Sequence, residues 1–257
     1  MVRAQVAKRI HCCGGDLSEW LTTHPRSLSR QETQILSELL GPARREQLIE
    51  DWQAPTQGPS TLTDDWDYLE ASFRLISDFI HDGVTFRQPL SDALDLLAEE
   101  AVEHHVDSAL ELREFLFIEK RLNGNHQHEN DPRNSDLAWS IANGKSNPVG
   151  CCAIYLLLAV RLDIDVELVD FPHHMLCRII EDSTPFILDA YDYGALHLQS
   201  ALRDDAELSS AHRKTLQSSV SSDILLLRLL ETLAADLNEA NRPEDEAVIL
   251  SLIQSIQ

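Results

Sequence analysis

The stretch that sets the architecture of this chain is Asn147-Pro-Val-Gly-Cys-Cys-Ala-Ile-Tyr-Leu-Leu-Leu-Ala-Val-Arg-Leu162. Within it, Cys151–Val160 is an uninterrupted apolar run. A helix that is apolar on every side is normally buried at the centre of a domain. The run has ten residues, whereas a helix needs roughly 20 to span a bilayer. The sequence therefore predicts a central buried helix over 151–162 rather than a membrane span.

Short strands are expected after this helix. Val166–Val169 and Met175–Ile180 are rich in β-branched and apolar residues, and Pro185–Ala190 is a third run of this kind. The four residues 181–184 between the last two runs suit an antiparallel hairpin. A small antiparallel sheet is therefore predicted beside the central helix, and after Gly194 we expect the chain to return to helix.

The residues before the central helix are predicted to be almost entirely helical. Ser29 and Glu32 match the capping box Ser-x-x-Glu, and they begin a helix that Gly41 and Pro42 should end. A short helix over 43–52 should follow. Apolar residues at helical spacing then predict three further helices, over 66–80, 94–102 and 110–121.

The character of the sequence changes at 122–135, where turn-forming residues are many and apolar residues few. An irregular surface segment is expected there, followed by a short helix Asp136–Ala142 with Ser135 as its cap. Near the end of the chain, 225–237 and 244–256 are predicted to form a pair of helices.

Along the chain, the predicted order is several helices, one buried helix, a small sheet and further helices. This order predicts an α+β fold. We divide the chain into four parts on this basis. They are a partly loose helical region 1–62 with a loop at 53–62, a helical domain 63–121, a core 122–200 and a helical tail 201–257.

The 257-residue chain carries a formal net charge of −22. Such an acidic protein repels phosphate backbones and anionic lipids, which disfavours nucleic acids and membranes as partners, and a protein or peptide partner is expected instead. The N-terminus lacks a continuous apolar segment, so we expect no signal peptide. The five cysteines form no disulfide framework and no CxxC pair, which favours the cytoplasm and disfavours structural zinc. We expect no metal and no other cofactor.

A cysteine, a histidine and an aspartate follow one another in an order that suits thiol chemistry. Cys151 opens the central helix, where the helix dipole stabilises a thiolate. His174 and Asp189 lie on consecutive predicted strands, so a hairpin would bring the imidazole and the carboxylate together. The alternative is structural: Cys151 and Cys152 are small apolar residues of a core helix, and His174 is a strand histidine with a local partner.

Other residues carry weaker signals. Cys177 is expected to be inert, and His173 should face away from its neighbour because strand side chains alternate. His104-His105 are adjacent on a helix and cannot share a face. His126 and His128 lie in the irregular segment, so neither pair predicts a metal site. Cys12-Cys13 is assigned no function.

Six segments between residues 115 and 191 resemble the SirB1 family of the transglutaminase-like superfamily in their order and spacing. The resemblance implies a papain-like core in a bacterial-type protein, with a tetratricopeptide-like C-terminal tail. The segments are FLF (115–117), LNGN (122–125), DPRNS (131–135), NPVGCCAIYLLLAVRL (147–162), PHHMLCR (172–178) and FILDAY (186–191).

The resemblance also implies a Cys–His–Asp arrangement in the active relatives, with His174 and Asp189 at the positions of the family's histidine and aspartate. By register, Gly150 takes the place of a family serine and Cys151 is displaced by one residue, which rotates a helical side chain by about 100°. The segment 131–135 suits either a wall of the cleft or a plain turn and cap. Candidates for lining the cleft are Asn125, Arg133, Asn134, Gly150, Cys152 and Tyr191.

Two functions remain open. The leading one is a non-catalytic or degenerate binding scaffold that retains the cleft. The alternative is a cysteine-dependent enzyme that acts on an amide or acyl bond by hydrolysis, deamidation or amide exchange. In that case Cys151 attacks, His174 acts as base and then acid, Asp189 orients it, and backbone N–H groups at the helix start hold the oxyanion. A metal hydrolase is a third class, which we do not expect.

Overall fold

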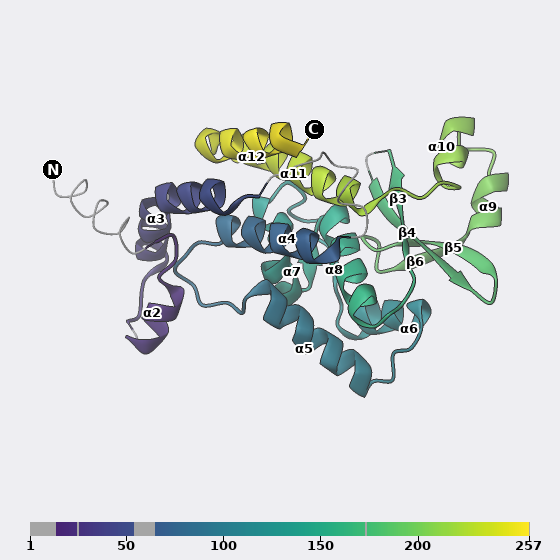
Figure 1. Ribbon diagram of the computed structural model, residues 1–257, viewed down its shortest axis with the longest axis horizontal. Coiled ribbons are helices and arrows are strands. Elements are labelled where there is room, and N and C mark those ends of the chain that lie inside the picture. Colours follow the sequence, from purple (N-terminus) through teal and green to yellow (C-terminus); the bar gives the residue numbers. More distant parts are fainter. Residues whose placement is uncertain (1–13, 25, 54–64, 173, 257) are drawn as a thin grey trace.

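The computed structural model describes residues 14–24, 26–53, 65–172 and 174–256. Most of these residues are helical, and a four-stranded sheet lies at one end of the molecule (Figure 1). The predicted α+β class is confirmed. Cys12, Cys13, His173 and residues 54–62 of the expected loop lie outside the described residues.

The α-helices lie before, between and after the strands along the chain. They are α2 (Ser18–Thr23), α3 (Arg30–Asp51), α4 (Trp66–Ile80), α5 (Leu90–Glu103), α6 (Ala109–Arg113), α7 (Leu137–Asn143), α8 (Pro148–Arg161), α9 (Gln199–Asp204), α10 (Ser210–Thr215), α11 (Ser222–Glu239) and α12 (Pro243–Ile256). A π-helical turn η2 (Glu114–Glu119) continues α6, and a 3-10 turn η3 (Pro132–Ser135) precedes α7.

The strands form two sheets. The larger is antiparallel, in the order β3-β4-β5-β6, and the smaller is a parallel pair, β1 with β2. The strands are β1 (Asn123–Gly124), β2 (Lys145–Ser146), β3 (Glu167–Phe171), β4 (His174–Glu181), β5 (Thr184–Asp189) and β6 (Ala195–Leu198).

Helix α8 lies at the centre of the molecule, and it confirms the predicted buried helix. Every residue of Val149–Ala159 is buried. Asn147 caps the helix start by accepting the N–H of Gly150 at 2.7 Å. The hydroxyl of Tyr155 donates to the carbonyl of Ala109 at 2.7 Å, so this polar group within the apolar run is satisfied.

The predicted hairpin between the last two expected strands is confirmed as β4–β5. Its turn residues Asp182 (φ 47°) and Ser183 (φ 64°) are both left-handed, which matches the twist of an antiparallel pair. The expectation of helix directly after Gly194 is wrong, because β6 pairs with β5 there. Strand β6 has only four residues, which is too short for a recognisable alternating pattern.

Helix α3 is continuous, so the prediction that Gly41 and Pro42 end it is wrong, although the predicted capping box at Ser29 is confirmed. A proline inside a helix normally costs about 3 kcal/mol. Leu40 and Leu48, on either side of Pro42, are both buried, and α3 packs against α4 and α12. Tertiary packing on both halves therefore overrides the local preference.

Two details of the helices before α8 also differ from expectation. Val102 is 62% exposed, so it is not part of the apolar stripe of α5. The cap of α7 is Asp136, which accepts the N–H of Trp139 at 3.0 Å. Ser135 does not cap the helix because its hydroxyl accepts a hydrogen bond from the Asn147 amide at 3.0 Å instead.

The segment 122–135 is irregular as expected, but it is not wholly on the surface. Asn125, Asn134 and Ser135 are buried. The amide of Asn125 donates to the side-chain oxygen of Asn134 at 2.8 Å, and Asn134 donates to the carbonyls of His128 and Glu129 at 2.8 and 2.9 Å. Amide hydrogen bonds hold this loop inside the protein, and hydropathy alone does not reveal them.

Helices α11 and α12 form the predicted pair and run along one long side of the molecule (Figure 1). Helix α11 packs against both α4 and α8, so the C-terminal pair is joined to the core. Among the described residues, no helix combines the length and the apolar character that a bilayer crossing requires.

Candidate functional site

A cavity of about 650 Å³ lies where the start of α8, the start of β4 and one face of α11 meet. We call it the His174 cavity. Of the predicted site residues, His174 and Tyr191 line it. Other side chains that line it are Glu129, Val149, Asp170, Arg228, Glu231 and Asp236.

His174 and Asp189 are in direct contact. The Nε2 atom of His174 lies 2.9 Å from Oδ1 of Asp189, and the same oxygen accepts the backbone N–H groups of Tyr191 and Asp192 at 3.0 and 3.1 Å. Burial alone would raise the pKa of Asp189, but these hydrogen bonds and the imidazole charge lower it below its usual value. The carboxylate therefore stays ionised, and it holds the proton of the imidazole on Nε2.

Tyr191 forms the wall beside His174. The two rings meet edge to face, with centroids 5.9 Å apart and planes at 81°. A Cβ at Gly124 would lie 2.5 Å from the Tyr191 ring, so only glycine lets the ring take this position. Burial and the nearby Glu129 carboxylate raise the pKa of Tyr191 to about 12. Its hydroxyl is therefore protonated at neutral pH and can donate a hydrogen bond.

The thiols of α8 are not part of the cavity wall. Cys151 and Cys152 have 0% exposed surface, and neither contributes to the lining of the His174 cavity. Cys152 donates to the carbonyl of Met175 at 3.2 Å. Burial raises the pKa of both thiols, and the charges of Asp189 and Cys177 raise that of Cys151 further. Both thiols are therefore held in the protonated form.

Position 150 cannot carry a side chain without rearrangement. A Cβ built on Gly150 would lie 2.1 Å from Oγ of Ser146 and 3.1 Å from the carbonyl oxygen of Asn134. That direction points into the packed loops beside α8. A side chain at position 150 would therefore point into these loops and would need Ser146 to move.

The residues of α8 that reach the cavity come from its first turn. Asn147, Pro148 and Val149 line the cavity, and Val149 is 7% exposed. Proline has no N–H group, and the N–H groups of Gly150 and Cys151 are bonded to Asn147, at 2.7 Å to its side chain and 3.0 Å to its carbonyl. This turn therefore presents an apolar wall and few free donors for an oxyanion.

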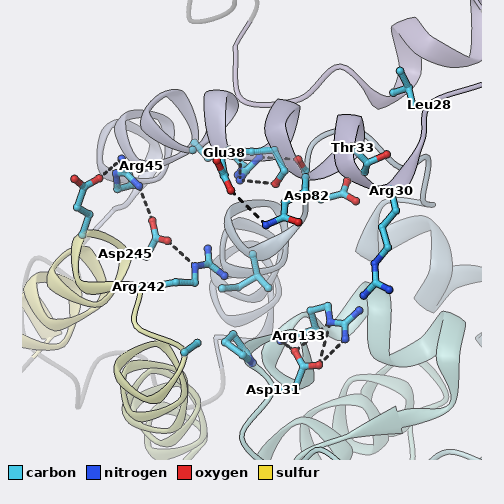
Figure 2. A pocket seen from close by; sticks show the side chains of 18 residues that line it. Leu28, Arg30, Thr33, Glu38, Arg45, Asp82, Asp131, Arg133, Arg242 and Asp245 are labelled. Atoms are coloured by element: carbon cyan, nitrogen blue, oxygen red, sulfur yellow. Dashed lines mark hydrogen bonds and ion pairs between the residues drawn. The ribbon is translucent and has the colours of Figure 1, made fainter. Parts of the chain in front are cut away.

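The remaining predicted cleft residues lie elsewhere. Asn125 and Asn134 form the buried amide network of the loop before α7. Arg133 lies on a different cavity, of about 920 Å³, between α3, η3 and the connection of α11 to α12 (Figure 2). There it pairs with Asp131 at 2.6 Å and lies over the ring of Trp139. In the same cavity Arg45 and Arg242 both pair with Asp245.

The contribution of α11 to the His174 cavity is not predictable from local sequence patterns. Arg228 and Asp236 are more than 50 residues from His174 along the chain, so no local pattern joins them. One signal is present in the sequence. Leu229 and Leu233 continue to Asp236 at helical spacing, which places a carboxylate on the apolar stripe of a helix. A charge in such a position points to a buried polar site.

Comparison with known proteins finds relatives that match part of this chain. A UPF0162 protein from Xylella fastidiosa (strain 9a5c) is 31% identical over 116 residues, which is 45% of this chain and 39% of that protein. Another, from Xylella fastidiosa (strain Temecula1 / ATCC 700964), is 34% identical over 80 residues, 31% of this chain and 28% of that protein. The matched part of this chain thus spans less than two fifths of the length of either relative. No solved structure matches the chain.

The match to a family model is longer. Residues 86–231 match the model described as the transglutaminase-like superfamily. This range begins just before α5 and ends within α11, so it contains the His174–Asp189 pair, the α8 thiols and most of the cavity wall. Because it covers more than half of the sequence, the chain belongs to the transglutaminase-like superfamily.

Proposed function

We propose that this chain is a cytoplasmic, non-catalytic binding protein that uses the His174 cavity to hold a segment of a protein or peptide partner. The observation that carries the proposal is that the α8 thiols are sealed in the core. Cys151 and Cys152 have 0% exposed surface, and burial raises the pKa of both. The thiolate is the reactive form of cysteine, so neither side chain is suited to attack a ligand in the cavity.

Within the superfamily, we place the chain in the SirB1 family, with α11 and α12 as a tetratricopeptide-like tail. The segments 131–135, 147–162 and 172–178 support this assignment. The packing of α8 against β4 is consistent with a papain-like core. Because α11 supplies one wall of the cavity, a ligand held there would contact the core and the tail together.

The alternative, a cysteine-dependent enzyme, is favoured by one observation, the 2.9 Å contact between His174 and Asp189. In that reaction His174 would take the proton of Cys151, and the thiolate would attack the carbonyl carbon of an amide. His174 would then return the proton to the leaving amine, and water would release the acyl group. The first step requires Cys151, which has no exposed surface and does not line the His174 cavity, to become accessible to the ligand.

Cysteine alkylation separates the two functions. The native protein is treated with iodoacetamide at about pH 7.5, below the ordinary pKa of a thiol, and the modified cysteines are mapped by peptide mass spectrometry. We expect Cys151, Cys152 and Cys177 to stay unmodified in the folded protein and to react after denaturation in urea, since all three are buried. Mapping by peptide keeps any signal from Cys12 and Cys13 separate.

The enzyme would be supported by a different outcome. Rapid alkylation confined to Cys151, increasing with pH and abolished by His174→Ala, would show a thiol paired with the imidazole. That result would overturn the non-catalytic proposal. Cys177→Ala serves as the control, because it removes a buried thiol that does not line the His174 cavity and has no role in either function.

A further inference from the structure

The His174 cavity contains a carboxylate for which the described residues provide no counter-ion. Asp236 lines the cavity and is 4% exposed, and its Oδ2 atom has no hydrogen-bond partner in the part of the chain that the structure describes. A carboxylate buried without a partner is costly, and folded proteins normally satisfy such groups. A leucine at this place on α11 would avoid the cost, so packing alone does not account for the charge.

The basic side chains that line the His174 cavity are bound to carboxylates other than Asp236. Arg228, about two turns earlier on α11, donates to both oxygens of Asp170 at 3.0 and 2.9 Å and to Glu231 at 3.1 Å. The imidazole of His174, another cavity group that can carry a positive charge, is bonded to Asp189 at 2.9 Å. Arg228 and His174 are therefore both engaged away from Asp236.

The charges around Asp236 are mostly negative. Glu129, Asp170 and Glu231 line the same cavity, and among its described lining residues Arg228 is the one arginine or lysine. Outside the cavity wall, Glu239 and Asp131 also act on Asp236, and together with burial they raise its pKa to about 7. The His174 cavity is therefore short of positive charge, and its least satisfied atom is Oδ2 of Asp236.

The remaining walls suit an aliphatic chain that carries a charge at its end. Val149, Phe171, Met175 and Tyr191 provide apolar and aromatic surface between the start of α8 and the sheet. Side chains with a hydrocarbon stem and a terminal cation bury the stem against such a surface and place the cation on a carboxylate. A volume of about 650 Å³ accommodates such a side chain together with its flanking peptide.

We propose that the His174 cavity binds the positively charged side chain of a lysine or arginine in a partner peptide, with Asp236 as its counter-ion. The proposal rests on the proposed binding function and names the class of ligand. The carboxylates of Glu129, Asp170 and Glu231 in the same cavity also attract a basic peptide electrostatically.

The test uses a set of fluorescein-labelled short peptides that are identical apart from the central residue. The central residue is arginine, lysine, citrulline or norleucine, in an otherwise neutral glycine–serine–alanine sequence. Binding to the full-length protein is followed by fluorescence anisotropy at low ionic strength. We expect the arginine or the lysine peptide to bind at least about tenfold more tightly than its neutral counterpart, citrulline or norleucine.

Variants assign this selectivity to Asp236. Asp236→Asn keeps the shape of the side chain and removes its charge, and we expect it to abolish the preference for the charged peptide. Glu207→Gln is the matched control, because it makes the same change of net charge at an exposed residue that does not line the cavity, and it should retain the preference. Circular dichroism establishes that both variants are folded.

The inference is overturned if the charged and neutral peptides bind equally, if none of the peptides binds, or if Asp236→Asn keeps the full preference. These outcomes are independent of the alkylation result. A reactive Cys151 would contradict the non-catalytic function and leave the charge preference standing. Equal peptide affinities with unreactive thiols would contradict the charge preference and leave the non-catalytic function standing.

Discussion

His174 donates from Nε2 to Oδ1 of Asp189 over 2.9 Å, so the first residue of β4 is fixed by the last residue of β5. The same carboxylate accepts two backbone N–H groups from the turn that follows β5. Among the described residues, Nδ1 of His174 has no hydrogen-bond partner. Asp189 therefore fixes the orientation of the imidazole that lines the cavity and leaves its second nitrogen available to a ligand.

Replacing the Asp189 charge should weaken the fold in a pH-dependent way. The pKa of Asp189 is lowered in the folded protein, so its contribution is present above the unfolded value of 3.8 and is lost as the pH falls through the folded value. We expect Asp189→Asn to reduce the free energy of unfolding at neutral pH by about 1 kcal/mol, since the carboxylate is partly exposed. Urea unfolding at neutral pH and in strongly acidic buffer measures the difference, which should shrink towards zero in acid. A constant difference at all pH values would contradict a role for the charge.

The elements that the sequence predicts correctly are those formed by interactions between residues close together along the chain. Helix α8 and the β4–β5 hairpin are predictable because their signals, an apolar run and a short turn between strands, are local. The contact of His174 with Asp189 follows from the hairpin. Strand β6 and the passage of α3 through Pro42 are not predictable in this way, because they depend on pairing with β5 and on packing against α4 and α12.

The cavity wall shows the same limit more clearly. Arg228 and Asp236 reach the site only because α11 packs against α8, and no spacing within the sequence encodes that approach. The burial of the Cys151 side chain is also not predictable from the sequence. Its place on the helix is predictable, but which neighbours cover it depends on tertiary packing.

Because a Cβ at position 150 would collide with Ser146, even a small side chain there should lower the stability of the protein. Gly150→Ser would place Cβ 2.1 Å from Oγ of Ser146, whose hydroxyl is held by Asn134 and Ser140. We expect the variant to lose about 2 kcal/mol of stability by overpacking, measured by urea unfolding. Adding Ser146→Ala should recover part of the loss. The double variant is also the control, because it keeps the serine at position 150 and lacks the nearest clashing atom, Oγ of Ser146. No recovery of stability in the double variant would argue against the clash.

A cysteine introduced in place of Val149 should be more reactive than the native thiols of α8. Val149 lines the His174 cavity, whereas Cys151 does not. We expect Val149→Cys to be alkylated by iodoacetamide at least about tenfold faster than Cys151 in the same folded protein, because it places the sulfur at the cavity wall. Peptide mass spectrometry after digestion distinguishes the two sulfurs by fragment ions. Combining the substitution with His174→Ala tests whether the imidazole assists, in which case the rate should fall. Labelling of the introduced thiol as slow as that of Cys151 would show that the wall of α8 is not accessible.

Removing the charge of Asp236 should stabilise the protein above neutral pH in the absence of a ligand. The pKa of Asp236 is raised from 3.8 to about 7 by burial and by Glu239 and Asp131, so between these values the folded state binds a proton that the unfolded state has lost. Over that range the stability of the native protein falls as the pH rises. Asp236→Asn has no such dependence, and we expect its free energy of unfolding to exceed that of the native protein by about 2 kcal/mol in mildly alkaline buffer, after allowance for solvent screening, with little difference near the unfolded pKa.

Urea unfolding in acidic, neutral and mildly alkaline buffers gives this comparison for Asp236. Glu207→Gln is again the control, because its side chain is exposed, and it should show no pH-dependent gain. A variant Asp236→Asn that is less stable than the native protein in alkaline buffer would mean that the carboxylate has a partner within the fold. The case for an external cation at this position would then be lost, because the charge would already be neutralised without a ligand.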